Sequence, residues 1–257
     1  MLILAVGDVI GKPGRQTVQK ILPGLRKQYN LDMVIVNSEN AAGGLGLTVN
    51  TARELLDAGA DVLTSGNHIW DQKEIIPYLD SDMPILRPLN YPPGVPGRGC
   101  LIQGNIAIVN LIGRTFIGNY DCPFRAMDSL LSGFKSNYSI IIVDFHAEAT
   151  SEKVAMSRYL DGRVSAVVGT HTHVGTVDAS IFPHGTAHVT DIGMTGPSDS
   201  IIGDDVETVL KRFLTAIPRR LAVGSGKKMV FNSVLINVDE KTGQSISIER
   251  IDREVEI

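Results

Sequence analysis

The stretch Leu2-Ile3-Leu4-Ala5-Val6-Gly7-Asp8 shows the pattern that decides the fold, because an apolar run passes directly into a glycine and a carboxylate. A continuous apolar run of this length is typical of a strand that is buried on both faces. Further runs of this kind, rich in β-branched residues, lie at residues 33 to 36, 61 to 64, 106 to 112, 139 to 143 and 164 to 168. The sequence therefore predicts buried strands, the first of them at residues 2 to 6.

Amphipathic segments separate several of these strands and have the spacing of helices. They lie at about residues 14 to 29, 48 to 58, 70 to 79, 123 to 132 and 151 to 161. Pro23 is expected to break the first of them, because proline removes a helical hydrogen bond. Strands that alternate with helices predict an α/β fold.

The pattern changes after residue 176, where shorter alternating segments are typical of antiparallel strands. A helix is predicted near residues 204 to 214. The antiparallel strands are expected at around residues 177 to 181, 186 to 190, 229 to 238 and 244 to 251. No segment rich in Ser, Gly or charge divides the chain, so we expect a single domain over residues 1–257.

The composition excludes several classes of protein. A net charge of -4 gives no broad basic surface, so we expect no extended nucleic-acid interface. The only two cysteines, Cys100 and Cys122, cannot form a disulfide framework, which favours a cytoplasmic location. No apolar run approaches the roughly 18 residues of a membrane span. An apolar patch on the short C-terminal strands would support a homo-oligomer.

Ligand-type side chains follow five of the predicted strands. The carboxyl ends of strands in an open α/β sheet form one edge, where ligands bind, so the fold would bring these residues together. The mixture of nitrogen and oxygen ligands suits Mn, Fe or Zn better than Ca or Mg, and there are enough groups for two ions. The residues are Asp8, Glu39, Asn40, Asn67, His68, His146, His171 and His173.

Each of these residues has an ordinary structural explanation when it is considered alone. Asp8 can cap a helix, Asn67 can lie in a turn, and a lone buried histidine is more often hydrogen-bonded in a core than bound to metal. Five strand ends that all carry a ligand-type residue, one of them with His171 and His173 in a His-x-His pattern, favour a metal site instead.

Two ions about 3.5 to 4 Å apart polarise a phosphoryl oxygen and lower the pKa of water, which favours phosphoester hydrolysis. A bridge between two ions requires a carboxylate. Glu39 is the candidate, because Asp8 comes too early in the array to be its central group. His68 is placed to protonate the leaving oxygen, since it lies beside a ligand but is not needed as one.

Five motifs in this array resemble the signature of the calcineurin-like metallophosphoesterases. They are Gly7-Asp8, Ser38-Glu39-Asn40, Gly66-Asn67-His68, Asp144-Phe145-His146 and Gly169-Thr170-His171-Thr172-His173. The sequence is more similar to a bacterial branch, the 2′,3′-cyclic-nucleotide 2′-phosphodiesterases. The resemblance implies a two-sheet α/β sandwich and hydrolysis of 2′,3′-cyclic nucleotides to 3′-nucleotides, with two Fe or Mn ions, or Zn, as cofactors.

The sequence departs from the superfamily pattern at two places that match the bacterial branch. Ile10 stands where the superfamily has a histidine ligand, and Glu39 replaces the bridging aspartate. By resemblance, one ion is held by Asp8, Glu39, Asn40 and His173. The other is held by Glu39, Asn67, His146 and His171.

The residues leave two other functions open. A phosphomonoesterase or protein phosphatase can use the same metals, and a regulatory RNA- or protein-binding protein can keep them for structure. Two features are given structural interpretations. Glu148 is interpreted as helix-start chemistry, and the basic cluster Arg219, Arg220, Lys227 and Lys228 is interpreted as a solvated loop too small to bind nucleic acid.

Overall fold

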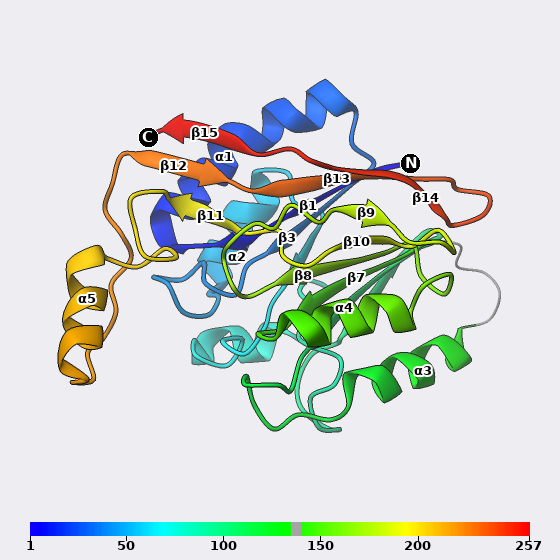
Figure 1. Ribbon diagram of the computed structural model, residues 1–257, viewed down its shortest axis with the longest axis horizontal. Helices are drawn as coiled ribbons and strands as arrows, with labels where there is room; N and C mark the ends of the chain where they lie inside the picture. The colour runs from blue at the N-terminus through cyan, green and yellow to red at the C-terminus, as the bar shows by residue number, and fades with distance from the viewer. Residues whose placement is uncertain (135–139) are drawn as a thin grey trace.

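The computed structural model describes residues 1–134 and 140–257 and shows two central sheets between layers of helices (Figure 1). The first sheet has the order β14-β13-β1-β3-β4. Its members β1, β3 and β4 run parallel, while β13 is antiparallel to both β1 and β14. The strands span Leu2–Val6 (β1), Met33–Asn37 (β3), Val62–Thr64 (β4), Ser233–Val238 (β13) and Ser245–Arg250 (β14).

The second sheet has the order β5-β6-β7-β8-β10-β9, and β6, β7, β8 and β10 in its middle are parallel. A third, smaller sheet has the order β15-β12-β11-β2. The second sheet comprises Cys100–Gln103 (β5), Ile106–Ile112 (β6), Ile140–His146 (β7), Ala166–Thr170 (β8), Ser180–Ile181 (β9) and Ala187–Val189 (β10). The third comprises Asp8–Val9 (β2), Met194–Pro197 (β11), Lys228–Phe231 (β12) and Arg253–Glu256 (β15).

Helices cover both outer faces of this pair of sheets. In Figure 1, α1 lies above the sheets and α3 and α4 lie below them, while α5 projects to the left. The helices span Gly11–Tyr29 (α1), Val49–Asp57 (α2), Pro123–Gly133 (α3), Thr150–Tyr159 (α4) and Val206–Thr215 (α5), with a 3-10 helix at Lys73–Tyr78 (η1). None of the helices in the described part of the chain has both the length and the apolar character that a bilayer crossing requires.

The core explains why the strands are apolar on both faces. Alternate residues of β1 point in opposite directions. Leu4 packs with Leu22 of α1 in one cluster, while Ile3 packs with Ile108 and Ile142 of the second sheet in another. A third cluster lies between the second sheet and helices α3 and α4. The predicted two-sheet α/β sandwich is confirmed, and its core is built in three layers.

Several expected boundaries were wrong. Pro23 lies inside α1 without ending it, because buried residues on both sides, Val18 and Leu25 among them, hold the helix against the sheet. The segment at 70 to 79 forms only a 3-10 turn, with Pro77 inside it. β7 continues to His146, and the predicted start of this strand at residue 139 lies outside the described residues.

The C-terminal strands also differ from the expectation. The predicted strand at 229 to 238 is two strands in different sheets, separated at Asn232, whose carbonyl accepts a hydrogen bond from Gly7 N at 3.0 Å. The segment at 177 to 181 pairs only at Ser180–Ile181. The short strands β2, β5, β11 and β15 were not predicted.

Candidate metal centre

The structure brings all eight predicted site residues to one region at the ends of the parallel strands. Asp8 lies in β2, Glu39 and Asn40 follow β3, and Asn67 and His68 follow β4. The other three come from the second sheet: His146 is the last residue of β7, while His171 and His173 follow β8. The expectation that strand ends would gather these side chains is confirmed by this placement.

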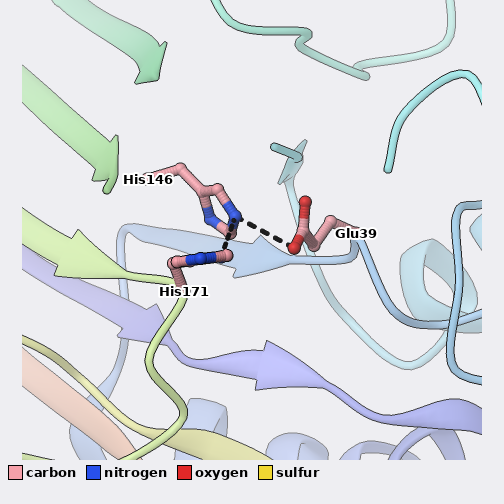
Figure 2. Close-up of side chains that lie close together, drawn as sticks. All are labelled: Glu39, His146 and His171. Atoms are coloured by element: carbon pink, nitrogen blue, oxygen red, sulfur yellow. Dashed lines mark hydrogen bonds and ion pairs between the residues drawn. The ribbon is translucent and has the colours of Figure 1, made fainter. Parts of the chain in front are cut away.

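Glu39, His146 and His171 form the tightest group (Figure 2), and their ligand atoms all lie within 4.8 Å of one another. His146 Nε2 lies 2.9 Å from Glu39 Oε1 and 3.0 Å from His171 Nδ1. The side-chain oxygen of Asn67 is 3.2 Å from the same His146 nitrogen. These four side chains therefore direct ligand atoms toward one point and can hold a metal ion.

Asp8, Asn40 and His173 form a second group beside the first. Asp8 Oδ1 lies 3.8 Å from His173 Nε2, and Asn40 Nδ2 lies 3.0 Å from the same nitrogen. Asn40 thus presents its amide nitrogen here, and binding a metal through its oxygen requires a half-turn of the amide group. Asp8 Oδ1 is also 3.9 Å from His146 Nδ1, so the two groups adjoin.

The backbone around the site allows this close approach. A Cβ atom on Gly66 would lie 2.2 Å from Glu39 Oε2 and 2.3 Å from His146 Nε2, so only glycine fits there. His171 and His173 have φ values of 101° and 65°, a left-handed region that residues with a Cβ rarely adopt. Strain of this kind is concentrated at functional sites, where the surrounding structure holds it in place.

Each of the three clustered histidines has its outer ring nitrogen bound to an oxygen. His146 Nδ1 lies 2.9 Å from Thr170 Oγ1, and the Thr170 hydroxyl donates its one proton to Asp144 at 2.7 Å. Thr170 must therefore accept from His146 Nδ1–H, which leaves Nε2 to face Glu39. This fixes the tautomer that a metal ligand needs.

The other two histidines are also held through the ring nitrogen that faces away from the cluster. His171 Nε2 lies 3.1 Å from Glu148 Oε2, which leaves Nδ1 to face His146. His173 Nδ1 lies 2.7 Å from the carbonyl of Ile202, which leaves Nε2 to face Asp8. All three imidazoles thus turn one ring nitrogen toward the site.

Glu39, His146 and His171 shift one another's pKa values. Burial alone would lower the pKa of His146, but the charge of Glu39 and its hydrogen bond outweigh this and raise the pKa to about 9. Burial likewise opposes ionisation of Glu39, yet His146 brings its pKa down to about 2. Burial, followed by repulsion from His146, lowers the pKa of His171 to about 3, so this ring stays neutral.

Asp8 gives the clearest sign that the site is built for a cation. The residue is fully buried, and its Oδ1 atom has no hydrogen-bond partner among the residues that the structure describes. Burial raises the pKa of this carboxyl to about 6, against the attraction of His173 and His146. Burying a carboxylate costs free energy unless the group is paired with a positive charge or binds a metal. The residues present therefore fit a metal centre.

The ring of His68 is held by an acid three residues further along the chain. Its Nδ1 atom lies 2.8 Å from Asp71 Oδ2, while its backbone N–H donates to Glu39 Oε2 at 3.3 Å. The side chain is 30% exposed and lines a cavity of 550 Å³ together with His171 and His173. This places an oriented imidazole beside the candidate metal ligands and open to a ligand.

Sequence reasoning missed the residues that orient the histidines. Glu148 does not cap α4, where no side-chain cap is formed, so its helix-start interpretation was wrong. Its position two residues after His146 could have indicated a role at the site. Asp71 comes three residues after His68, and this spacing could also have indicated a contact between them. Thr170 lies within a motif that drew attention only to its histidines.

Comparison with known protein families shows which family the chain belongs to. The family described as YmdB-like protein matches residues 4–251. The chain belongs to this family. A relative in Bacillus subtilis (strain 168), named 2′,3′-cyclic-nucleotide 2′-phosphodiesterase, is 48% identical over 98% of this chain and 96% of its own length. The resemblance read from the five motifs is thereby confirmed.

Solved structures of similar proteins support the same grouping. The crystal structure of a hypothetical protein from Thermus thermophilus has a TM-score of 0.92 at 46% identity, covering 99% of each chain. A protein of Mycoplasma pneumoniae described as a novel phosphatase has a TM-score of 0.93 at 35% identity, covering 100% of this chain and 94% of the other. The family fold therefore extends over the whole length of this chain.

Proposed function

We propose that this protein is a metal-dependent phosphodiesterase that hydrolyses 2′,3′-cyclic nucleotides to 3′-nucleotides. The observation that carries the proposal is the common orientation of His146, His171 and His173. Each outer ring nitrogen is bound to an oxygen and each inner nitrogen faces the cluster. The name of the Bacillus subtilis relative supplies the substrate class.

The residues divide into two sets that share Glu39, as the motifs imply. One ion would be held by Asp8, Glu39, Asn40 and His173, and the other by Glu39, Asn67, His146 and His171. The contacts of His173 with Asp8 and Asn40 support the first set, and the contacts of His146 with Glu39 and Asn67 support the second. Transition-metal ions, Fe or Mn or alternatively Zn, suit these nitrogen and oxygen donors and would supply Lewis-acid activation of the phosphoryl group and of water.

His68 is proposed as the general acid. Hydrolysis adds water at phosphorus and breaks the bond between phosphorus and the 2′ oxygen, so the 2′ oxygen must receive a proton. A protonated His68 can donate it, because Asp71 holds Nδ1 at 2.8 Å and leaves Nε2 for the substrate. The product keeps its phosphate on the 3′ oxygen.

Two other functions remain as alternatives on the same residues. A phosphomonoesterase or protein phosphatase would use the same centre, and the description of the Mycoplasma pneumoniae protein as a phosphatase favours it over the other. A regulatory RNA- or protein-binding protein would keep the centre with little turnover.

The test is a panel of esters offered to metal-loaded protein, with the products separated by chromatography. We expect turnover of 2′,3′-cyclic nucleotides to 3′-nucleotides, and nearly complete loss of it in a folded Glu39→Gln variant, which keeps the shape of the side chain and removes its charge. Faster turnover of phosphomonoesters or phosphopeptides would favour the first alternative. Metal binding without turnover of any ester would favour the second.

The setting of the protein is also part of the proposal. We propose, as the sequence predicts, that the protein is a single domain, lies in the cytoplasm and forms a homo-oligomer. Cys100 and Cys122 are both free, which fits a reducing compartment.

A further inference from the structure

The cavity at the metal cluster continues away from it toward a group of arginines. Glu39, His171 and His173 line one part of the 550 Å³ cavity, while Arg219 and Arg220 line another. This volume lies within the range that encloses small organic ligands. The cavity therefore has room for more than the phosphate group at the cluster.

A second cavity, also of 550 Å³, adjoins the first. Its lining includes Lys12, and it shares Gly43, Arg220 and Leu221 with the first cavity. The hollow thus runs from the cluster, past Arg220, to another basic side chain. On a chain with a net charge of -4, this concentration of positive charge is local.

The charges along this path distinguish Arg219 and Arg220 from their neighbours. The two acidic groups of the first cavity apart from Glu39 lie near other side chains of its lining: Glu148 contacts His171 at 3.1 Å, and Asp204 lies near His173 and Arg212. Within residues 1–134 and 140–257, Arg219 and Arg220 form no side-chain hydrogen bond or ion pair. Both residues are exposed, so their guanidinium groups are free to bind an anion.

The chemistry of the proposed substrate indicates which anion Arg219 and Arg220 would bind. A cyclic mononucleotide has one phosphate, and that phosphate reacts at the cluster. A second phosphate on the same nucleoside must be carried by the 5′ oxygen, because the 2′ and 3′ oxygens are both used by the ring. Guanidinium groups bind phosphate through paired N–H donors, which makes arginine well suited to this position.

We infer that Arg219 and Arg220 bind a phosphate on the 5′ oxygen of the nucleoside whose 2′,3′-cyclic phosphate lies at the metal cluster. This inference rests on the proposed function and narrows its substrate class. The 5′ phosphate is either a terminal group or the link to a preceding nucleotide. The adjoining cavity with Lys12 provides room for the preceding nucleotide.

The experiment compares three substrates with the metal-loaded protein. They are adenosine 2′,3′-cyclic phosphate, the same compound with a 5′-phosphate, and an adenylyl-adenosine dinucleotide that ends in a 2′,3′-cyclic phosphate. We expect kcat/KM to be about 10- to 100-fold higher for a substrate with the 5′ phosphate, which is the usual value of hydrogen bonds to a charged group. The preference should weaken as salt is added.

Variants then locate the preference. In Arg219→Ala/Arg220→Ala the ratio of kcat/KM with and without the 5′ phosphate should fall to about one. Lys227→Ala is the matched control: Lys227 is an exposed cation that follows the same segment and lines neither cavity, so its loss should keep the wild-type ratio. All three substituted residues are exposed, so the variants should fold.

The outcomes separate the two possible sources of the phosphate. A preference for both phosphorylated substrates, or for either one alone, supports the inference if it is lost in the double arginine variant. Preference for the dinucleotide alone identifies the end of an RNA chain as the source. A wild-type ratio near one, or a ratio unchanged in the double variant, overturns the inference and leaves the proposed function intact. A wild-type protein that hydrolyses none of the three overturns the proposed function and the inference with it.

Discussion

Lys153 and Asp191 form a buried ion pair, with Nζ of the lysine 2.6 Å from Oδ2 of the aspartate. The same oxygen accepts hydrogen bonds from the backbone N–H of Thr172 at 3.1 Å and from its hydroxyl at 2.7 Å. Thr172 lies between the two histidines whose backbones adopt positive φ. The ion pair therefore anchors the segment that holds two of the proposed metal ligands.

Lys153→Met should destabilise the protein by about 3 to 5 kcal/mol, because removal of one partner leaves a buried charge without compensation. The measurement is denaturant unfolding at neutral pH. Arg163→Met is the matched control, since Arg163 pairs with Asp128 at 2.6 Å on the surface, and its loss should not change the unfolding midpoint measurably. Equal midpoints for the two variants would show that the buried pair does not stabilise the fold.

Thr170→Val should weaken metal binding by about 10- to 100-fold, because it removes the oxygen that holds His146 Nδ1–H while preserving the side chain's shape. Thr170→Ser keeps the hydroxyl and should bind metal nearly as well as the wild type. Titration of metal-free protein against a competing chelator gives both affinities. If valine and serine at position 170 bind metal equally well, the hydroxyl does not orient the ligand.

Metal binding should strengthen as the pH rises toward about 9. The neighbouring Glu39 raises the pKa of His146 to about 9 in the metal-free site, so the ring is protonated at neutral pH. A metal ion must displace this proton, and the apparent affinity should increase by up to about tenfold per pH unit until the ring is neutral. Proton release on addition of Mn²⁺ at pH 7 in weak buffer checks this. A metal affinity that is constant from pH 6 to pH 9 would contradict it.

His68→Ala should slow substrates with poor leaving groups far more than those with good ones. Turnover of a 2′,3′-cyclic nucleotide should fall by about 10²- to 10⁴-fold, the usual contribution of a general acid. A p-nitrophenyl phosphodiester should be less affected, because its phenolate leaves without a proton.

Elemental analysis and a second variant control this experiment. His68→Ala should keep its metal, whereas His171→Ala should lose metal and slow both substrates alike. Equal slowing of the two substrates by His68→Ala, with its metal content unchanged, would assign His68 to positioning the phosphoryl group.

The strands and the site were predictable because both depend on local sequence patterns. A doubly buried strand must be apolar throughout, so β1 and β6 were found with the correct limits. The proposed ligand residues lie at or just after the ends of such strands, and parallel strands bring their ends to one edge. The positions of Glu39 and His171 at the cluster therefore followed from the order of strands and motifs.

The features that the sequence did not predict depend on contacts between distant parts of the chain. Lys153 lies in a helix of mixed polarity, and lysine there is ordinarily solvated, so nothing local indicates that it pairs with Asp191. The two-residue strand β2 forms only because β11 lies beside it. The segment around Arg219 is basic in sequence, and only the fold shows that it borders the same cavity as Glu39.

The most direct test of the proposed two-metal centre is to titrate metal-free protein with Mn²⁺ and follow hydrolysis of a 2′,3′-cyclic nucleotide at each step. Seven candidate ligands are too many for one tetrahedral ion. We expect activity to rise until two equivalents of metal are bound per chain, and to be absent from Glu39→Gln at every point. Activity that is complete at one equivalent, or that does not depend on added metal, would contradict a centre of two ions joined by Glu39.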